Sequence, residues 1–409
     1  MMIPKLLTVF ALAGLGAVTL APDLVLKATD HRKLGKDVAA YWTARTEVEG
    51  IDESFSKLST DIKKVDATLR KKDQGPLLAL VADWREIFWT ASQSILEDRK
   101  LKKGKITEEK SAEPVFTYWA PKKFSSKKGP APIVLIVPDA DQTAQDVLET
   151  SWADEAIRGG AMLVVVSIEG DPATWSGDAG FAAVMGTFGR VIRTNMFGFD
   201  FDRIYLAGHG KGFAAAAATA AYFPHLFAGL IGRGEIPSAD PTNFRNVATY
   251  LGGGGESATF ARGVEELGYG NSTTGEDSAA AIWAWMQEHT RNSSPAHITF
   301  APPTATSRSA GWVKVTGIDL DGSPKVDAVA DRASNTITIT AKGVSIVDVY
   351  FNDVLVDLDQ PVRVIVNGGT PHEDLFARNP KYMVDRAYDF GDWASVFTAT
   401  ASYDVPSTN

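Results

Sequence analysis

The chain has 409 residues, of which 44% are hydrophobic and 22% charged, a composition typical of a globular protein with room for two or three domains. Its net charge of −9 argues against sequence-independent binding of nucleic acid, which depends on lysine and arginine side chains against phosphate. The chain has no cysteine, so disulfides, thiolate metal sites and cysteine nucleophiles are excluded.

Residues 1–28 have the pattern of a targeting segment. One basic residue, Lys5, precedes an uncharged apolar run over residues 6–21. The run is short for a transmembrane helix, which needs about 20 residues, and is typical of a signal peptide. Pro22 disfavours cleavage directly after the run, and Ala28 is an alternative site. We therefore expect an exported protein (periplasmic, cell-envelope or extracellular), with an uncleaved membrane anchor as the alternative.

Residues 29–112 show helical periodicity. Two sets of apolar residues spaced three and four apart are separated by a break at Gly75-Pro76, where a new helix can start. The sets are Phe55, Leu58, Ile62, Val65 and Leu69, then Leu77, Leu80, Val81, Trp84, Ile87 and Phe88. We expect a module of two or three packed helices, since two heptads are short for a partner-binding coiled coil. Residues 97–110 are predicted to be a charged linker whose basic run is a solvated face.

From residue 113 to residue 293 short apolar runs alternate with longer helix-like segments. Fully apolar strands separated by helices are typical of a parallel sheet covered on both faces. We expect strands at 115–119, 132–137, 161–168, 203–208, 227–231 and 246–251, and helices at 145–157, 181–194, 212–222, 257–267 and 278–290. The predicted fold of this part is an α/β domain with a doubly wound, mostly parallel sheet.

Residues 297–409 have an all-β pattern. The segment at 335–341 alternates strictly between polar and apolar residues, and strand-like segments follow at 344–358 and 362–369. Turn signals at Asn352-Asp353 and Asn367-Gly368 punctuate them. We expect a small β-sandwich. Residues 317–323 lack the later ligands of a calcium loop and are predicted to be a plain turn.

One segment of the α/β region carries a family resemblance. Residues 202–212 read DRIYLAGHGKG, and this stretch resembles the strand and turn that present the nucleophile in the α/β-hydrolase superfamily, particularly secreted bacterial esterases and peptidases of the feruloyl-esterase and polyhydroxyalkanoate-depolymerase kind. The resemblance covers residues 115–291. The turn, called the elbow below, is Gly208, His209, Gly210, Lys211 and Gly212. Where the family has a serine this chain has Gly210, which has no side chain to attack an acyl carbon.

The other catalytic positions that the resemblance implies also depart from the family. The loop before the last helix, residues 268–277, should supply a histidine and contains none. The acid should follow the strand at 246–251, where Glu256 is the nearest carboxylate, although it equally suits the start of a helix. In the oxyanion loop, Asp139 and Asp141 would oppose a developing negative charge. We therefore predict no catalytic residue, and Asp139, Asp141 and Glu256 as residues lining the former cleft.

The same residues carry groups that can support other chemistry. His209 with these carboxylates could bind a metal, but the spacing matches no metal motif, and the phosphate-loop pattern fails because Tyr205 stands where its first glycine belongs. No metal and no cofactor are predicted. The predicted function is a non-catalytic binding or structural pseudo-hydrolase whose ligand is a small molecule, glycan or peptide of unknown identity. The alternatives are an active serine-type esterase or peptidase with catalytic groups recruited from elsewhere, and an architectural protein assembled through the N-terminal helices.

Overall fold

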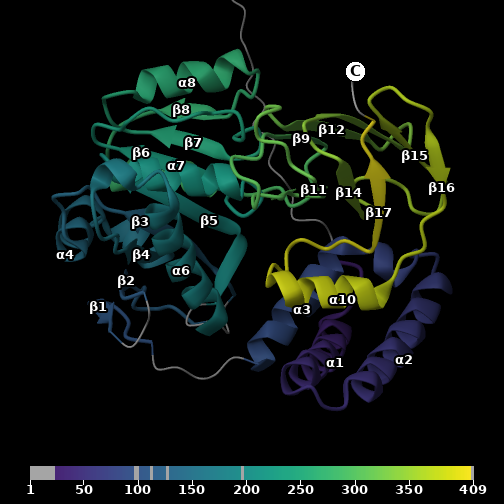
Figure 1. Ribbon diagram of the computed structural model, residues 1–409. Coiled ribbons are helices and arrows are strands. Elements are labelled where there is room, and N and C mark those ends of the chain that lie inside the picture. The colour runs from purple at the N-terminus through teal and green to yellow at the C-terminus, as the bar shows by residue number, and fades with distance from the viewer. Residues whose placement is uncertain (1–23, 96–100, 111–113, 126–128, 195–197, 407–409) are drawn as a thin grey trace, which may run out of the picture.

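A computed structural model describes residues 24–95, 101–110, 114–125, 129–194 and 198–406, and Figure 1 shows its three parts. An α/β domain lies beside a β-sandwich, and a group of helices packs below them in this view. The predicted apolar run of residues 6–21 lies outside the described residues. Within those residues, no helix is both long enough and apolar enough to cross a membrane.

The helical module is formed by α1 (Ala28–Glu47), α2 (Ile51–Arg70) and α3 (Val81–Ile95). Its core is aromatic, because Trp42 stacks on Phe88 with ring centroids 5.6 Å apart and Trp84 contacts the same ring. Between α2 and α3, residues Leu77–Ala79 form a single 3₁₀ turn after the predicted break. The predicted helical packing of this region is therefore confirmed.

A helix from the far end of the chain completes this module. Helix α10 (Pro380–Phe390) buries Met383 and Val384 in the same core, and Trp42 Nε1 donates a hydrogen bond of 3.1 Å to the carbonyl of Val384. The prediction that residues 297–409 are all β is thus wrong for α10. In Figure 1 this yellow helix lies against α1.

The α/β domain contains an eight-stranded sheet with the order β1-β2-β4-β3-β5-β6-β7-β8. Strand β2 is antiparallel to both of its neighbours, and the strands from β4 to β8 are parallel. The strands are β1 (Ile106–Glu109), β2 (Phe116–Trp119), β3 (Ala131–Val137), β4 (Met162–Val166), β5 (Phe199–His209), β6 (Gly229–Arg233), β7 (Ala248–Leu251) and β8 (Ser272–Thr274). Three predictions are corrected. Strand β1 lies in the segment predicted to be a linker, and β8 in the loop predicted to precede the last helix. The helix predicted at 145–157 is divided into α4 (Ala144–Asp146), a π-helical turn at Val147–Ser151 and α5 (Glu155–Gly160).

Both faces of this sheet are buried, as the apolar runs predict. Along β3, Ile133 and Leu135 belong to the core on one side of the sheet, whereas Val134 and Ile136 belong to the core on the other. Helices α6 (Asp178–Thr194), α7 (Gly212–Tyr222) and α8 (Ser257–Glu266) cover the first side. The second side is covered by α5 (Glu155–Gly160) and α9 (Ala279–Glu288). The predicted doubly wound, mostly parallel sheet is confirmed.

The β-sandwich consists of two sheets around one apolar core. One sheet has the order β10-β11-β14-β17 and the other β16-β15-β13-β12-β9. The strands are β9 (His297–Phe300), β10 (Ser309–Ala310), β11 (Val313–Thr316), β12 (Lys325–Asp331), β13 (Thr336–Lys342), β14 (Ile346–Phe351), β15 (Val362–Val366), β16 (His372–Asp374) and β17 (Ala399–Asp404). The predicted sandwich is present, and the turn at Asn367 has the positive φ of 49° that its Asn-Gly signal indicates.

Candidate functional site

The elbow forms the predicted strand–turn–helix between β5 and α7. Gly210 has a φ of +47°, in the left-handed region that favours glycine, and its N–H donates to the carbonyl of Arg233 over 2.8 Å. A Cβ at Gly208 would meet the backbone of Phe213, and a Cβ at Gly212 would meet the carbonyls at the end of β3. The three glycines therefore allow the start of α7 to pack directly on the sheet.

The carboxylate of Asp139 lies at the elbow. The resemblance to α/β-hydrolases implies an oxyanion hole formed by the backbone N–H of the residue after the nucleophile and by an N–H of the loop after β3. Lys211 follows Gly210, and Ala140 lies in the loop after β3. The backbone N–H groups of both residues donate to Asp139 Oδ1, over 3.1 Å and 2.8 Å. These two N–H groups thus hold a carboxylate of the protein itself.

Gly210 provides the space for this carboxylate. A Cβ built on Gly210 would meet Oδ2, Cγ and Oδ1 of Asp139, each closer than the 3.0 Å that real Cβ atoms respect. Any side chain at position 210, serine included, would therefore compete with Asp139 for the same volume. The glycine and the aspartate are a sterically matched pair.

His209 points away from this position into the core. It is 5% exposed, and its Nε2 accepts a hydrogen bond of 2.9 Å from Trp152 Nε1. Burial, together with the nearby Arg233 cation, lowers the pKa of His209 to about 4. The ring is therefore neutral at pH 7 with its proton on Nδ1, and its Nε2 lone pair is engaged by the indole.

The loop where the family places its histidine instead holds an aspartate. Asp277 accepts a hydrogen bond of 2.5 Å from Arg233 Nε, and its second oxygen accepts one of 3.0 Å from Gly234 N. Arg233 is the last residue of β6, lies beside His209 in the sheet register and stands 5.2 Å from the ring of Trp152. This ion pair links the loop to the sheet, and neither of its members was predicted from the sequence.

The remaining predicted residues, Asp141 and Glu256, are exposed. Glu256 occupies the N-cap position of α8, is exposed and makes no side-chain capping bond, so the helix-start interpretation fits its position. Asp141 is exposed in the loop after β3. The glycine run at 252–255 packs backbone against backbone, since a Cβ at Gly253 would overlap Gly234. Glu235, which the sequence analysis missed, lies against Gly254.

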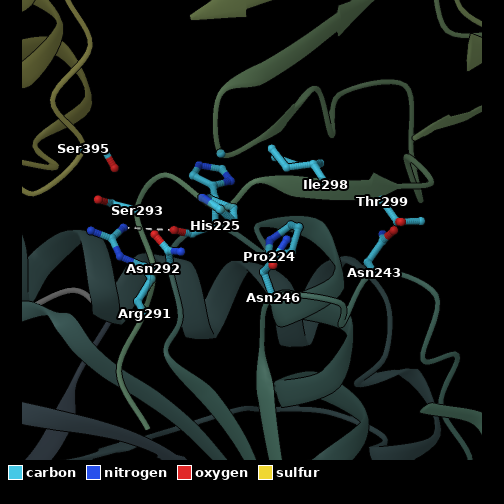
Figure 2. A pocket seen from close by; sticks show the side chains of 13 residues that line it. Pro224, His225, Asn243, Asn246, Arg291, Asn292, Ser293, Ile298, Thr299 and Ser395 are labelled. Carbon is cyan, nitrogen blue, oxygen red and sulfur yellow. Dashed lines mark hydrogen bonds between the residues drawn. The ribbon is translucent and has the colours of Figure 1, made fainter. Parts of the chain in front are cut away.

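The cavities that we find among the described residues lie away from the elbow. The one shown in Figure 2 lies between the α/β domain and the sandwich, has a volume of about 20 Å³ and has room for about one water-sized group. His225 stands at its centre; burial lowers the pKa of this ring to about 4, and its Nδ1 has no partner among the described residues. Two open grooves of about 370 and 300 Å³ lie at Lys325 and Lys342.

Two kinds of chemistry can be examined directly in the described part of the chain. There, no group of three or more histidine, aspartate or glutamate side chains is placed to hold a metal ion. Within those same residues, the histidine rings bond to carboxylates, an indole and backbone carbonyls, and none to a hydroxyl. A histidine that activates a serine or threonine needs such a bond or a close approach to one.

Solved structures similar to this chain include esterases and serine hydrolases of the α/β-hydrolase fold. A thermostable esterase is 15% identical with a TM-score of 0.35, and the match covers 46% of this chain and 62% of that one. A ferulic acid esterase is 11% identical with a TM-score of 0.35, and the match covers 45% of this chain and 97% of that one. An S-formylglutathione hydrolase from Agrobacterium tumefaciens is 15% identical with a TM-score of 0.34, and the match covers 45% of this chain and 91% of that one. No family model and no curated protein matches the sequence.

Proposed function

We propose that this protein is a non-catalytic member of the α/β-hydrolase fold, with a binding or structural role. The observation that carries the proposal is the pair formed by Asp139 and Gly210. Gly210 offers no nucleophile, and Asp139 occupies the two N–H groups that would stabilise an oxyanion. An acyl transition state at the elbow would have to displace the hydrogen-bonded carboxylate of Asp139. It would then develop its own negative charge beside that carboxylate.

The proposal extends to location and ligand. The apolar run at residues 6–21, preceded by Lys5, supports export, with the segment either removed as a signal peptide or kept as an anchor. The ligand class is a small molecule, glycan or peptide, since a hydrolase fold that has lost its nucleophile keeps the loops that surround the cleft. The elbow itself is closed by Asp139, so a ligand would contact the surrounding rim.

The test is an activity and labelling comparison of the purified protein with three variants. The natural protein, Gly210→Ser, and Gly210→Ser/Asp139→Gly are assayed on short-chain p-nitrophenyl esters and a peptide panel, and are treated with a fluorophosphonate that labels activated serines. We expect no turnover and no mass shift for the natural protein or for Gly210→Ser, where Asp139 still fills the site. A further variant, Asp139→Asn, keeps the volume of the side chain and removes its charge. The mass shift of this chain, which a contaminating esterase cannot produce, separates its own turnover from contamination.

Turnover by the natural protein that persists in Asp139→Asn and coincides with labelling of a serine would overturn the proposal. That result would favour the alternative, an active serine-type esterase or peptidase with recruited catalytic groups. The labelled residue would then identify the nucleophile. Weak turnover that appears only in Gly210→Ser/Asp139→Gly supports the proposal, because it shows that Asp139 and Gly210 together block the site.

A further inference from the structure

The structure gathers lysines at one edge of the α/β sheet. Two short segments meet there: the chain entering β1, with Lys102, Lys103 and Lys105, and the turn after β2, with Lys122 and Lys123. We refer to these five residues as the lysine edge. All five are exposed, and none has a carboxylate partner among the described residues. On a chain with a net charge of −9 this is a concentrated basic patch.

Local packing holds the two segments together. Strand β1 pairs antiparallel with β2, and Gly104 N donates to the carbonyl of Ala120 over 2.8 Å. Gly104 has a φ of +69°, and the aliphatic part of Lys122 lies against it, in the space that a Cβ would need. Lys103 Nζ donates to the carbonyl of Phe124 over 2.6 Å. The lysine edge is therefore a feature of the fold, although the sequence analysis predicted its first segment to be a solvated linker.

Like charges held this close repel one another, so an opposing anionic surface would stabilise them. On β1, Glu108 pairs with Lys110 at 3.2 Å and not with a lysine of the lysine edge. Each lysine near an anionic membrane surface strengthens binding about fivefold. We propose that the lysine edge docks this protein on a bilayer that contains anionic lipid.

Two observations favour a bilayer over nucleic acid. The lysine edge lines none of the cavities that we find among the described residues. Its neighbouring ring, Phe124, is partly buried against the core of the domain, so it does not offer the stacking platform that single-strand binders use. If the apolar run at residues 6–21 is kept as an anchor, it supplies a second membrane signal, and stable anchoring takes two. The inference does not depend on whether the elbow is catalytic.

The experiment is co-sedimentation of the full-length protein with two kinds of vesicle, phosphatidylcholine alone and phosphatidylcholine with phosphatidylglycerol. The test variant changes Lys102, Lys105, Lys122 and Lys123 to glutamine and keeps Lys103, which bonds to Phe124. The matched control changes Lys36, Lys63, Lys71 and Lys72, which are also exposed and unpaired among the described residues, so the net charge falls equally. Circular dichroism verifies that both variants are folded.

We expect the test variant to bind anionic vesicles about tenfold or more weakly than the natural protein at low salt, with the difference shrinking at high salt. The control should bind like the natural protein, and binding to neutral vesicles, which reports the apolar run alone, should be equal in all three. An equal loss of binding to anionic vesicles in the test and control variants would overturn the proposal. Unchanged binding in both variants would also overturn it. If the test variant keeps vesicle binding but loses binding to a DNA duplex, the surface serves nucleic acid and the proposal is wrong.

Discussion

Arg291 and Asp392 form a buried bidentate ion pair, with Nη1 donating to Oδ2 over 2.7 Å and Nη2 to Oδ1 over 2.9 Å. The backbone N–H of Arg291 also donates to the carbonyl of Asp202 in β5, and Arg85 of α3 pairs with the Asp202 carboxylate. Burial alone would raise the pKa of Asp392, but attraction and hydrogen bonds from Arg291 hold it well below its usual range. The pair thus joins the α/β domain to the segment after α10.

Arg291→Met is expected to destabilise the protein by about 3–5 kcal/mol, because it leaves the Asp392 charge buried without its partner. The midpoint of urea unfolding, followed by tryptophan fluorescence, measures the change. Arg70→Met is the control, since Arg70 and Asp66 form an exposed pair on α2 that should contribute less than about 1 kcal/mol. Equal shifts in the two variants would contradict the assigned role of the buried pair.

Gly210→Ala is expected to lower the free energy of unfolding by about 2–4 kcal/mol, because residue 210 has a positive φ and its added Cβ overlaps Asp139. Gly234→Ala is its control, because Gly234 has a φ of +67° but no atom closer than 3.7 Å to the added Cβ. Adding Asp139→Gly should reduce the cost of Gly210→Ala by at least about 1 kcal/mol in a double-mutant cycle. Additive effects of the two substitutions would show that they do not share the space.

The stability of the protein should fall on acidification below pH 6.5, in part because of His209. Its pKa is about 4 in the folded protein against 6.5 in the unfolded chain, so its contribution is complete above pH 6.5. Between these values the unfolded chain takes up a proton that the folded protein excludes, which lowers stability by up to about 1.4 kcal/mol per pH unit. His225, whose pKa is also about 4, acts in the same direction.

His209→Gln should therefore flatten the dependence of the unfolding midpoint on pH between 6.5 and 4, while the contribution of His225 remains. The amide oxygen of glutamine can still accept from Trp152. His372→Gln replaces an exposed histidine and is the control. The explanation fails if both substitutions leave the slope of the natural protein unchanged.

Met383→Ala should destabilise the helical module by about 2–5 kcal/mol, because Met383 is buried against α1–α3. Phe390→Ala removes a larger side chain from the same helix, but Phe390 is 58% exposed, so its effect should be much smaller. Hydrogen exchange locates the change: amides of α1–α3 should exchange faster in Met383→Ala, and those of β3–β7 should not. Uniform acceleration throughout the chain would instead indicate one cooperative unit.

The sequence predicted those elements whose burial leaves a strong periodic signal. The strands β3 and β4 are fully apolar because helices cover both of their faces. The strands β1 and β8 lie at the edges of the sheet, are three or four residues long and are largely polar, so nothing in their composition distinguishes them from loops. Helix α10 did have a signal, since Asn379 caps it and Pro380 starts it, but the β pattern around it dominated the interpretation.

At the candidate site, the resemblance of residues 202–212 to α/β-hydrolases predicted the elbow, because its glycines stand where the family has them. It also indicated Asp139 as a neighbour, but not that its carboxylate would bond to Lys211 N in the space above Gly210. That arrangement depends on two loops meeting across 72 positions of sequence. The pairing of Arg233 with Asp277 was missed for the same reason, because neither residue has a local pattern that points to the other.

The packing of α10 on α1 has a consequence for how the protein is made. The hydrogen bond between Trp42 and Val384 spans 342 positions, so during synthesis the apolar face of α1–α3 stays uncovered until nearly the whole chain has been produced. Contacts between residues so distant in sequence form slowly, and exposed apolar surface in the meantime promotes aggregation. A nascent chain that lacks residues 380–390 would expose the apolar face of α1–α3 to chaperones. This face is removed from solvent when the completed C-terminal segment leaves the ribosome and α10 packs on it.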